Sequence, residues 1–540
     1  MSNNCLVTSR LEETQNISDQ VYDVLYIEDY LDNVNIADAR KLTDAVFTHN
    51  KDFIAGYDYE GYKITWAWYS EIFQFCISYL EIFKLIQRVD LINQNTLTIG
   101  KIPNQYRKVI ETYFFDKDII QNKPKNSQLI FFRNMVLNLL MFCYSILSIL
   151  FLLLGNKKKV GIYTGDFVYK KTKSDFRLSH LYNKFEENKI DYVEFIRETT
   201  TKNFFVNILK RRRFSIYYTS IIFFVNFFTK KTQYKKKPID FFQSILFRYH
   251  NSNLVFLRSV NIIRIVLNFL RIDKFILFSF SSRSSHLAVS AKSLNIKTIG
   301  IMHGLSQKDY VVQEFIESYD ESKKIGCDVF GVWSKYYLNY FKKYSKVMDS
   351  NAFQISGLLR PIGVNNENSK FKRISDRKIK VLVISEPLVS VKEIIPYLKF
   401  LLNHKDIEVA FKVRPMVVDK YYEDMLVALP EISNLKTFDC KLEEVALNYD
   451  IFLGSHSTAV IEASLFSNIS ILINTVKYGD YYDINSLIPN CKLLINKPEE
   501  LYQNILYRLN NEHSLNTCDV IRKKFFGDNT DASNWFLDLL

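Results

Sequence analysis

The stretch "DIFLGSHSTAVIEAS", residues 450–464, joins the end of an apolar strand to a turn of small polar residues and the start of a helix. Ser457 and Thr458 are of the types that favour helix N-termini, so one interpretation is a capped helix with Glu462 on its surface. The other is an anion site, in which the N–H groups of the first turn bind a phosphate together with the hydroxyls of Ser455, Ser457 and Thr458. Glu462 follows Thr458 by four residues, on the same side of the helix, where it can accept both hydroxyls of a ribose.

The same alternation of strand and helix continues on both sides of this stretch. It covers 158–362 and restarts after a polar linker to cover 379–515, with a tail helix expected over 516–540. Such alternation predicts parallel sheets with helices on both faces. The predicted fold class is therefore α/β and GT-B-like, with two Rossmann-type parallel-sheet domains facing a cleft and an extra N-terminal α/β region over 1–125. Ligands of such sheets bind at the carboxyl ends of the strands.

Two other strand ends of the second domain carry polar residues. "FKVRP" ends on Arg414, whose planar guanidinium suits phosphate oxygens. An interdomain salt bridge is the alternative role for Arg414. "ISEP" brings Ser385 and Glu386 to the same edge, where we expect them to line the cleft.

In the first domain, "GIMHG" places His303 directly after a strand, and Gly304 allows a tight turn there. A histidine at this position can titrate near neutral pH and act as a base, or it can simply bond to neighbouring backbone. Asp166 follows the strand "KVGIYT" and is a further cleft candidate. His456 and His286 are weaker candidates, because each lies among serines that can serve as caps.

Taken together, the histidine-glycine turn, "DVFGVWS" with "SGLLR", the strand ending in Lys-x-Arg-Pro, and "STAVIEA" resemble GT-B glycosyltransferases of bacterial surface-polysaccharide synthesis. The resemblance spans 158–515 and includes capsule and O-antigen transferases that use CMP-activated Kdo or sialic acid. Polyol-phosphate transferases that use CDP-glycerol are also similar. Those relatives usually carry His-Pro where this chain has Arg414 and Pro415, so the type of nucleotide is left open.

The resemblance implies that Ser457 and Thr458 contact the donor phosphates, Glu462 the ribose, and that His303 is the base of an inverting transfer. Such a base must lie within hydrogen-bond reach of the acceptor hydroxyl. No Asp-x-Asp follows a plausible strand, so we expect a mechanism without a metal and without a cofactor.

The net charge of +13 resides in one segment of the chain. Between Asn156 and Pro238 there are 20 Lys and Arg against 7 Asp and Glu, and the remainder is neutral.

The seven cysteines are dispersed without a C-x-x-C spacing, which favours reduced thiols in the cytosol and gives no indication of zinc. The N-terminus lacks the layout of a signal peptide, so a cytoplasmic location is expected.

Two apolar segments point to a membrane. The run at 135–154, within an apolar helix expected over 130–157, is long enough for a single span, but a buried core helix and a helix lying on the membrane are alternatives. Segment 202–237 sets aromatic residues between two cationic clusters, which suits an anionic membrane surface. Nucleic acid is disfavoured, because the aromatics form a block instead of alternating with the charges. A solvated basic loop beside a core helix is the simplest alternative.

The sequence thus predicts a glycosyltransferase, peripheral on the inner membrane, that moves a sugar from a CMP-, CDP- or UDP-linked donor to a lipid-linked surface polysaccharide. A nucleotide-sugar 2-epimerase, a transferase of CDP-activated polyol phosphates and a non-catalytic assembly subunit are the alternatives. Fold alone does not decide among them.

Overall fold

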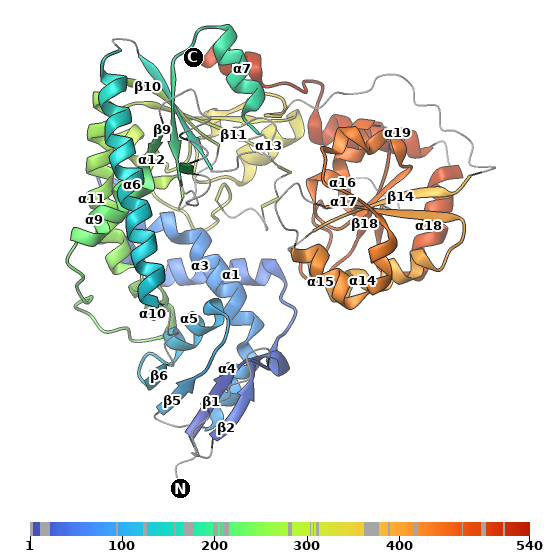
Figure 1. Cartoon of the computed structure of the whole chain (residues 1–540), viewed down its shortest axis with the longest axis horizontal. Helices are drawn as coiled ribbons and strands as arrows, with labels where there is room; N and C mark the ends of the chain where they lie inside the picture. The colour runs from blue at the N-terminus through green and yellow to red at the C-terminus, as the bar shows by residue number, and fades with distance from the viewer. Residues whose placement is uncertain are drawn as a thin grey trace.

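The computed structural model describes residues 4–10, 22–92, 96–121, 127–155, 158–165, 177–197, 204–205, 208, 215–278, 283–302, 304–305, 307–308, 313–360, 377–386, 389–413, 420–466, 468–487, 493–510 and 513–540. Three parallel sheets follow one another along the chain (Figure 1). The two larger ones are Rossmann-type, which confirms the predicted fold class.

The N-terminal region holds a four-stranded parallel sheet in the order β2-β1-β5-β6. Its strands are β1 (Asn4–Thr8), β2 (Tyr22–Tyr26), β5 (Thr96–Ile99) and β6 (Asp118–Gln121). Its helices are α1 (Ile36–His49), α2 (Lys51–Ala55), α3 (Tyr69–Glu81), α4 (Phe83–Ile92) and α5 (Asn104–Tyr113).

The helical periodicity of the run from Tyr62 to Val89 predicts one helix, and this prediction is wrong. Residues 62–68 form a strand and a 3₁₀ turn, the helix starts at Tyr69, and it is interrupted at Ile82. Burial explains the start: Trp66 is buried and stacks on Phe47 with 4.5 Å between ring centroids. Tertiary packing therefore outweighs helical periodicity in this segment.

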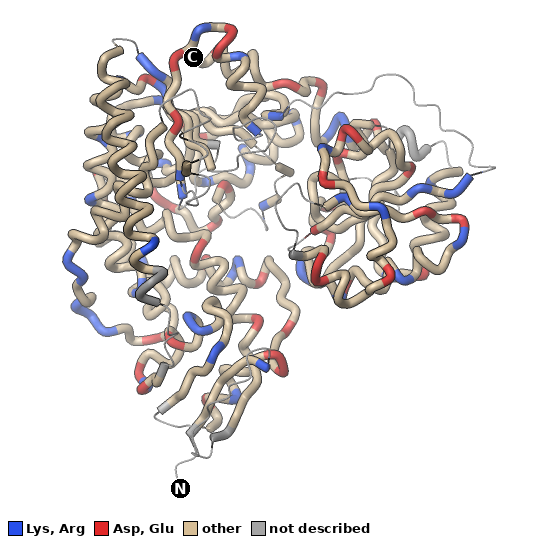
Figure 2. Tube along the Cα trace, in the orientation of Figure 1, with Lys and Arg blue, Asp and Glu red and all other residues tan. Residues whose placement is uncertain are grey.

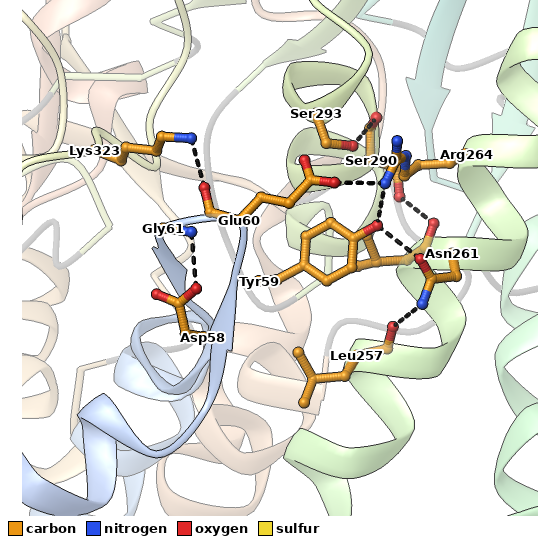
Figure 3. Close-up of polar contacts among 11 residues, drawn as sticks. Asp58, Tyr59, Glu60, Gly61, Leu257, Asn261, Arg264, Ser290, Ser293 and Lys323 are labelled. Atoms are coloured by element: carbon orange, nitrogen blue, oxygen red, sulfur yellow. Dashed lines mark hydrogen bonds and ion pairs between the residues drawn. The ribbon is translucent and has the colours of Figure 1, made fainter.

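The hairpin of β3 (Asp58–Tyr59) and β4 (Tyr62–Lys63) ties this region to the first Rossmann-type domain (Figure 3). The Tyr59 hydroxyl donates to Asn261 Oδ1 at 2.8 Å, and Arg264 donates to that hydroxyl at 2.6 Å. Arg264 also pairs with Glu60 at 2.7 Å. Glu60 and Gly61 at the turn have φ of 51° and 89°, so the tight turn uses a left-handed backbone that glycine adopts readily.

The first Rossmann-type sheet has seven parallel strands in the order β13-β12-β11-β10-β7-β8-β9. They are β7 (Lys159–Thr164), β8 (Tyr192–Ile196), β9 (Ser215–Tyr217), β10 (Ile272–Phe278), β11 (Lys297–Ile301), β12 (Val329–Val332) and β13 (Phe353–Ile355). The accompanying helices are α6 (Ser127–Leu153), α7 (Ser179–Glu187), α9 (Tyr218–Phe228), α10 (Phe241–Phe247), α11 (His250–Phe269), α12 (Ser285–Ser293) and α13 (Lys335–Tyr344).

The second Rossmann-type sheet has six parallel strands in the order β16-β15-β14-β17-β18-β19. They are β14 (Ile379–Ile384), β15 (Ile407–Lys412), β16 (Lys436–Phe438), β17 (Ile451–Gly454), β18 (Ile469–Ile473) and β19 (Leu494–Ile495). The strand order reverses between β14 and β17, and ligands of open α/β sheets bind at such a switch point.

The helices of the C-terminal part are α14 (Val391–Leu402), α15 (Lys420–Ala428), α16 (Thr458–Glu462), α17 (Ile484–Leu487), α18 (Glu499–Asn510), α19 (His513–Ile521) and α20 (Ser533–Leu539). The tail returns to the first Rossmann-type domain, where the C-terminus lies (Figure 1). Phe526 stacks on Trp333 with 5.6 Å between centroids, and the Ala532 N–H donates to the Leu358 carbonyl at 2.9 Å. The last helices therefore join the two domains a second time, besides the linker.

Candidate functional site

The switch point of the second sheet is occupied by the side chain of Glu386. This residue follows β14, is only 1% exposed, and accepts hydrogen bonds from the N–H groups of Ser455 (2.5 Å) and Ser457 (2.6 Å). Gly454 makes room for it, because a Cβ there would lie 3.0 Å from Glu386 Oε1 and 2.5 Å from Val460. The N–H groups of Ser455 and Ser457, which precede the first turn of α16, are thus bonded to an internal carboxylate.

The hydroxyls of the same turn have separate partners. Ser457 is the N-cap of α16, and its Oγ accepts from the Ala459 N–H at 3.4 Å. Thr458 Oγ1 accepts from the N–H of Leu305 at 3.2 Å, and Leu305 belongs to the loop after β11 of the first domain. Gly304 lies beside it, since a Cβ on Gly304 would be 3.5 Å from Thr458 Oγ1. The carboxyl edges of the two Rossmann-type sheets therefore meet at this pair of loops.

Glu462 lies at the end of α16, largely buried, and pairs with Arg360 across 3.4 Å. Burial raises the pKa of Glu462, and the Arg360 guanidinium opposes that rise. Arg360 is the last described residue of the first domain before the linker. The pair is a second polar contact between the domains, and it occupies the carboxylate that the sequence assigns to a ribose.

An aromatic cluster completes the turn around His456. Its ring stacks on Tyr478 with 3.9 Å between centroids, and the Tyr482 hydroxyl donates to the His456 carbonyl at 2.6 Å. The Tyr481 hydroxyl donates to the Leu305 carbonyl at 3.4 Å, so the cluster also reaches the first domain. These tyrosines follow β18, the strand beside β17, and the strand-end rule applied to "ISILINT" would have identified them.

Several predicted site residues lie outside the described part of the chain, namely His303, Asp166 and Arg414. Their proposed roles remain predictions. Ser385 is described: it is buried, and its N–H donates to the Lys412 carbonyl at 3.0 Å. His286 lies in the core against Phe256, and burial lowers its pKa to about 3, so it is a core histidine.

Charge at this edge is mixed. Burial lowers the pKa of the Lys412 amine, whose Nζ donates to the Val413 carbonyl at 2.8 Å, and nearby Arg360 lowers it further. Glu386 and Glu462 supply the negative charge. Within the described ranges, no group of three or more His, Cys, Asp or Glu side chains is arranged to hold a metal ion. Hydroxyls, carboxylates and cations thus meet at the junction of the two sheets, and in the structure they are bonded to one another or to the backbone.

The sequence matches no family model and no curated protein. Among solved structures, the chain is similar to the S. aureus MnaA–UDP co-structure (11% identity, 71% of this chain and 98% of that chain covered, TM-score 0.42). It is also similar to a glycosyltransferase from Rickettsia africae (14%, 71% and 98%, TM-score 0.42) and to Acinetobacter baumannii MurG (10%, 71% and 99%, TM-score 0.38). With TM-scores below 0.5, these likenesses carry no argument about activity, and the proposal below rests on the residues of this chain.

Proposed function

We propose that the protein is a GT-B-type glycosyltransferase that moves a sugar from a nucleotide-sugar donor to a lipid-linked surface polysaccharide. One observation carries the proposal: the Leu305–Thr458 contact joins the carboxyl edges of two Rossmann-type sheets. Two substrates bound at facing edges are close enough for direct transfer, and closing such an edge excludes water from the reaction.

In this proposal the donor binds to the second domain and the acceptor to the first. Arg414 and the hydroxyl of Ser457 contact the donor phosphate, and stabilise charge as the nucleotide leaves. Glu462 exchanges Arg360 for the ribose when the donor enters. His303, two residues before Leu305, takes the proton of the acceptor hydroxyl.

Nucleotide binding tests the proposal. Thermal unfolding is followed with CMP, CDP, UDP and GDP in turn, because a ligand of the folded state raises its stability. One nucleotide should raise the melting temperature of the wild type and raise it less in Glu462→Ala. The exposed Glu408→Ala is the control, since Glu408 lies on β15 away from the carboxyl edge. Failure of all four nucleotides to shift the transition would contradict the proposal.

The 2-epimerase is the competing reaction class. Incubating the protein with nucleotide sugars and no acceptor separates the two, because only an epimerase changes the sugar under those conditions. An altered sugar would replace the transferase proposal with the isomerase.

A further inference from the structure

Helices α6, α9 and α11 are neighbours on one side of the first Rossmann-type domain (Figure 1). Together they expose many large apolar side chains. We call this surface the lateral apolar face. Its exposed members are Phe131, Phe132, Val136, Leu139, Leu140, Ile146, Leu147, Leu150, Phe151 and Leu153 of α6, Phe227 and Phe228 of α9, and Ile262, Ile265 and Phe269 of α11. Soluble monomers rarely expose apolar patches of this extent, so the face requires a cover.

Helix α6 is held to the domain along one side, where Phe142, Ile149 and Leu152 pack partly buried against the main core. Met141, Ser145 and Ser148, spaced i, i+4 and i+7, are its buried side chains, and 17% of its most apolar stretch is buried. Ser145 Oγ accepts a hydrogen bond from the N–H of Tyr217, on the edge strand β9, at 2.9 Å. Since α6 protects this open sheet edge, we expect it to stay on the domain.

This attachment bears on how α6 can meet a membrane. By length and composition, two described segments are apolar enough to cross a bilayer, Phe131–Leu153 and Phe241–Phe269. The second contributes Phe256, Val260 and Ile263 to the protein core. If α6 crossed a bilayer, it would leave β9 and strip the Tyr217 N–H of its acceptor. With α6 in place, its 23 residues from Phe131 to Leu153 present an apolar surface about 35 Å long beside the domain.

The charge carried by the three helices of the lateral apolar face is positive. Helices α6, α9 and α11 contain no Asp or Glu. The loop after Phe228 carries five exposed lysines, which Figure 2 shows as a blue loop beside the helices: Lys230, Lys231, Lys235, Lys236 and Lys237. None of the five forms an ion pair with another described residue. Apolar side chains next to exposed lysines match the acyl boundary and the phosphates of an anionic bilayer.

We propose that the lateral apolar face docks in the plane of an anionic membrane, with α6 parallel to the surface and the lysine loop against the lipid phosphates. The purpose of docking, access to a lipid-linked acceptor, rests on the proposed function. The docking itself does not depend on that function, and neither does its test.

The test uses the purified full chain and sedimentation with vesicles of phosphatidylcholine alone or mixed with phosphatidylglycerol. The main variant is Leu147→Glu/Leu150→Glu/Phe151→Glu, three residues that are each 55% exposed and so are replaceable without disturbing the core. The matched control places glutamate at exposed apolar positions elsewhere: Leu91, Val427 and Leu447. A second variant changes Lys235, Lys236 and Lys237 to Gln. Circular dichroism and the nucleotide melting shift are recorded for each.

The wild type and the control should bind the anionic vesicles. The affinity of the α6 variant for these vesicles should be lower by a factor of about ten or more. The lysine variant should lose most of the salt-sensitive part of binding. Retention of the wild type after carbonate extraction would show a spanning helix and overturn the proposal. A wild-type dimer that the α6 variant dissociates, with no vesicle binding, would assign the face to a second copy and also overturn it. If a nucleotide raises the melting temperature but the protein does not bind vesicles, the docking alone is refuted. If the protein binds vesicles but no nucleotide raises its melting temperature, the proposed function alone is refuted.

Discussion

Replacing Glu386 by alanine should destabilise the second Rossmann-type domain strongly, although Glu386 is one residue in a loop. Its carboxylate is the acceptor for two backbone N–H groups, at 2.5 Å from Ser455 and 2.6 Å from Ser457. Ser455 is 4% exposed, so water does not readily replace the lost acceptor there. A buried donor left unsatisfied costs about 1–3 kcal/mol. The Ser457 N–H is partly buried and adds a smaller amount, so the expected loss is about 2–4 kcal/mol.

Glu393 provides the matched control. It also accepts a hydrogen bond from a backbone N–H, that of Val476 at 2.6 Å, but at an exposed position. Water replaces the carboxylate in Glu393→Ala, so the loss should stay below about 1 kcal/mol. Because a chain with several domains need not unfold in one step, hydrogen exchange in urea is followed over residues 451–462.

The two variants distinguish the reasoning from a general effect of removing negative charge. Glu386→Ala should unfold in less urea and exchange faster at Ser455 and Ser457 than Glu393→Ala. Equal losses in the two variants would refute the view that burial of the Glu386 carboxylate organises the strand-end turn.

Three further predictions concern single residues. Glu462→Ala should weaken nucleotide binding by about 1–3 kcal/mol in calorimetry, as for a lost charged hydrogen bond. An unchanged affinity would show that Glu462 serves only as the structural partner of Arg360. His303→Ala should lower turnover about 10²–10⁴-fold with donor affinity nearly unchanged, and near-normal turnover would remove His303 from the mechanism. Burial raises the pKa of Glu314 from 4.5 to about 7, so the folded state keeps a proton that the unfolded chain releases, and stability should fall by about 3 kcal/mol as pH rises between those values. The free energy of unfolding of Glu314→Gln, measured in urea, should not fall over this pH range. If its pH dependence equals that of the wild type, Glu314 is not the group responsible.

The two Rossmann-type sheets could be predicted from sequence because buried parallel strands are continuous apolar runs, such as "IKVLVI" and "DIFL". The strand-end rule also placed Glu386 and Ser455 at one edge. Their direct contact could not be predicted, since it requires β14 and β17 to be neighbours, and periodicity does not determine strand order. The Arg360–Glu462 pair depends further on how the two domains are oriented.

Helix boundaries near the site and in the N-terminal region were the weakest predictions. The sequence predicts one helix over 457–467, but α16 ends at Glu462 and continues as a 3₁₀ turn over Ala463–Phe466. These residues are almost fully buried between β17 and β18, so packing sets the geometry of the turn. The interruption at Ile82 has the same kind of cause, because Ile82 is fully buried.

The most direct test of the central claim is sugar transfer itself. The purified protein is incubated with CMP-, CDP- and UDP-linked sugars, with and without lipid-linked glycan extracted from membranes. The masses of the products are then measured by mass spectrometry. The account predicts that one donor releases its nucleotide only when the acceptor is present, and that the acceptor gains the mass of one sugar. Release or alteration of the donor sugar that is equally fast without any acceptor, with no gain of mass on the glycan, would contradict it.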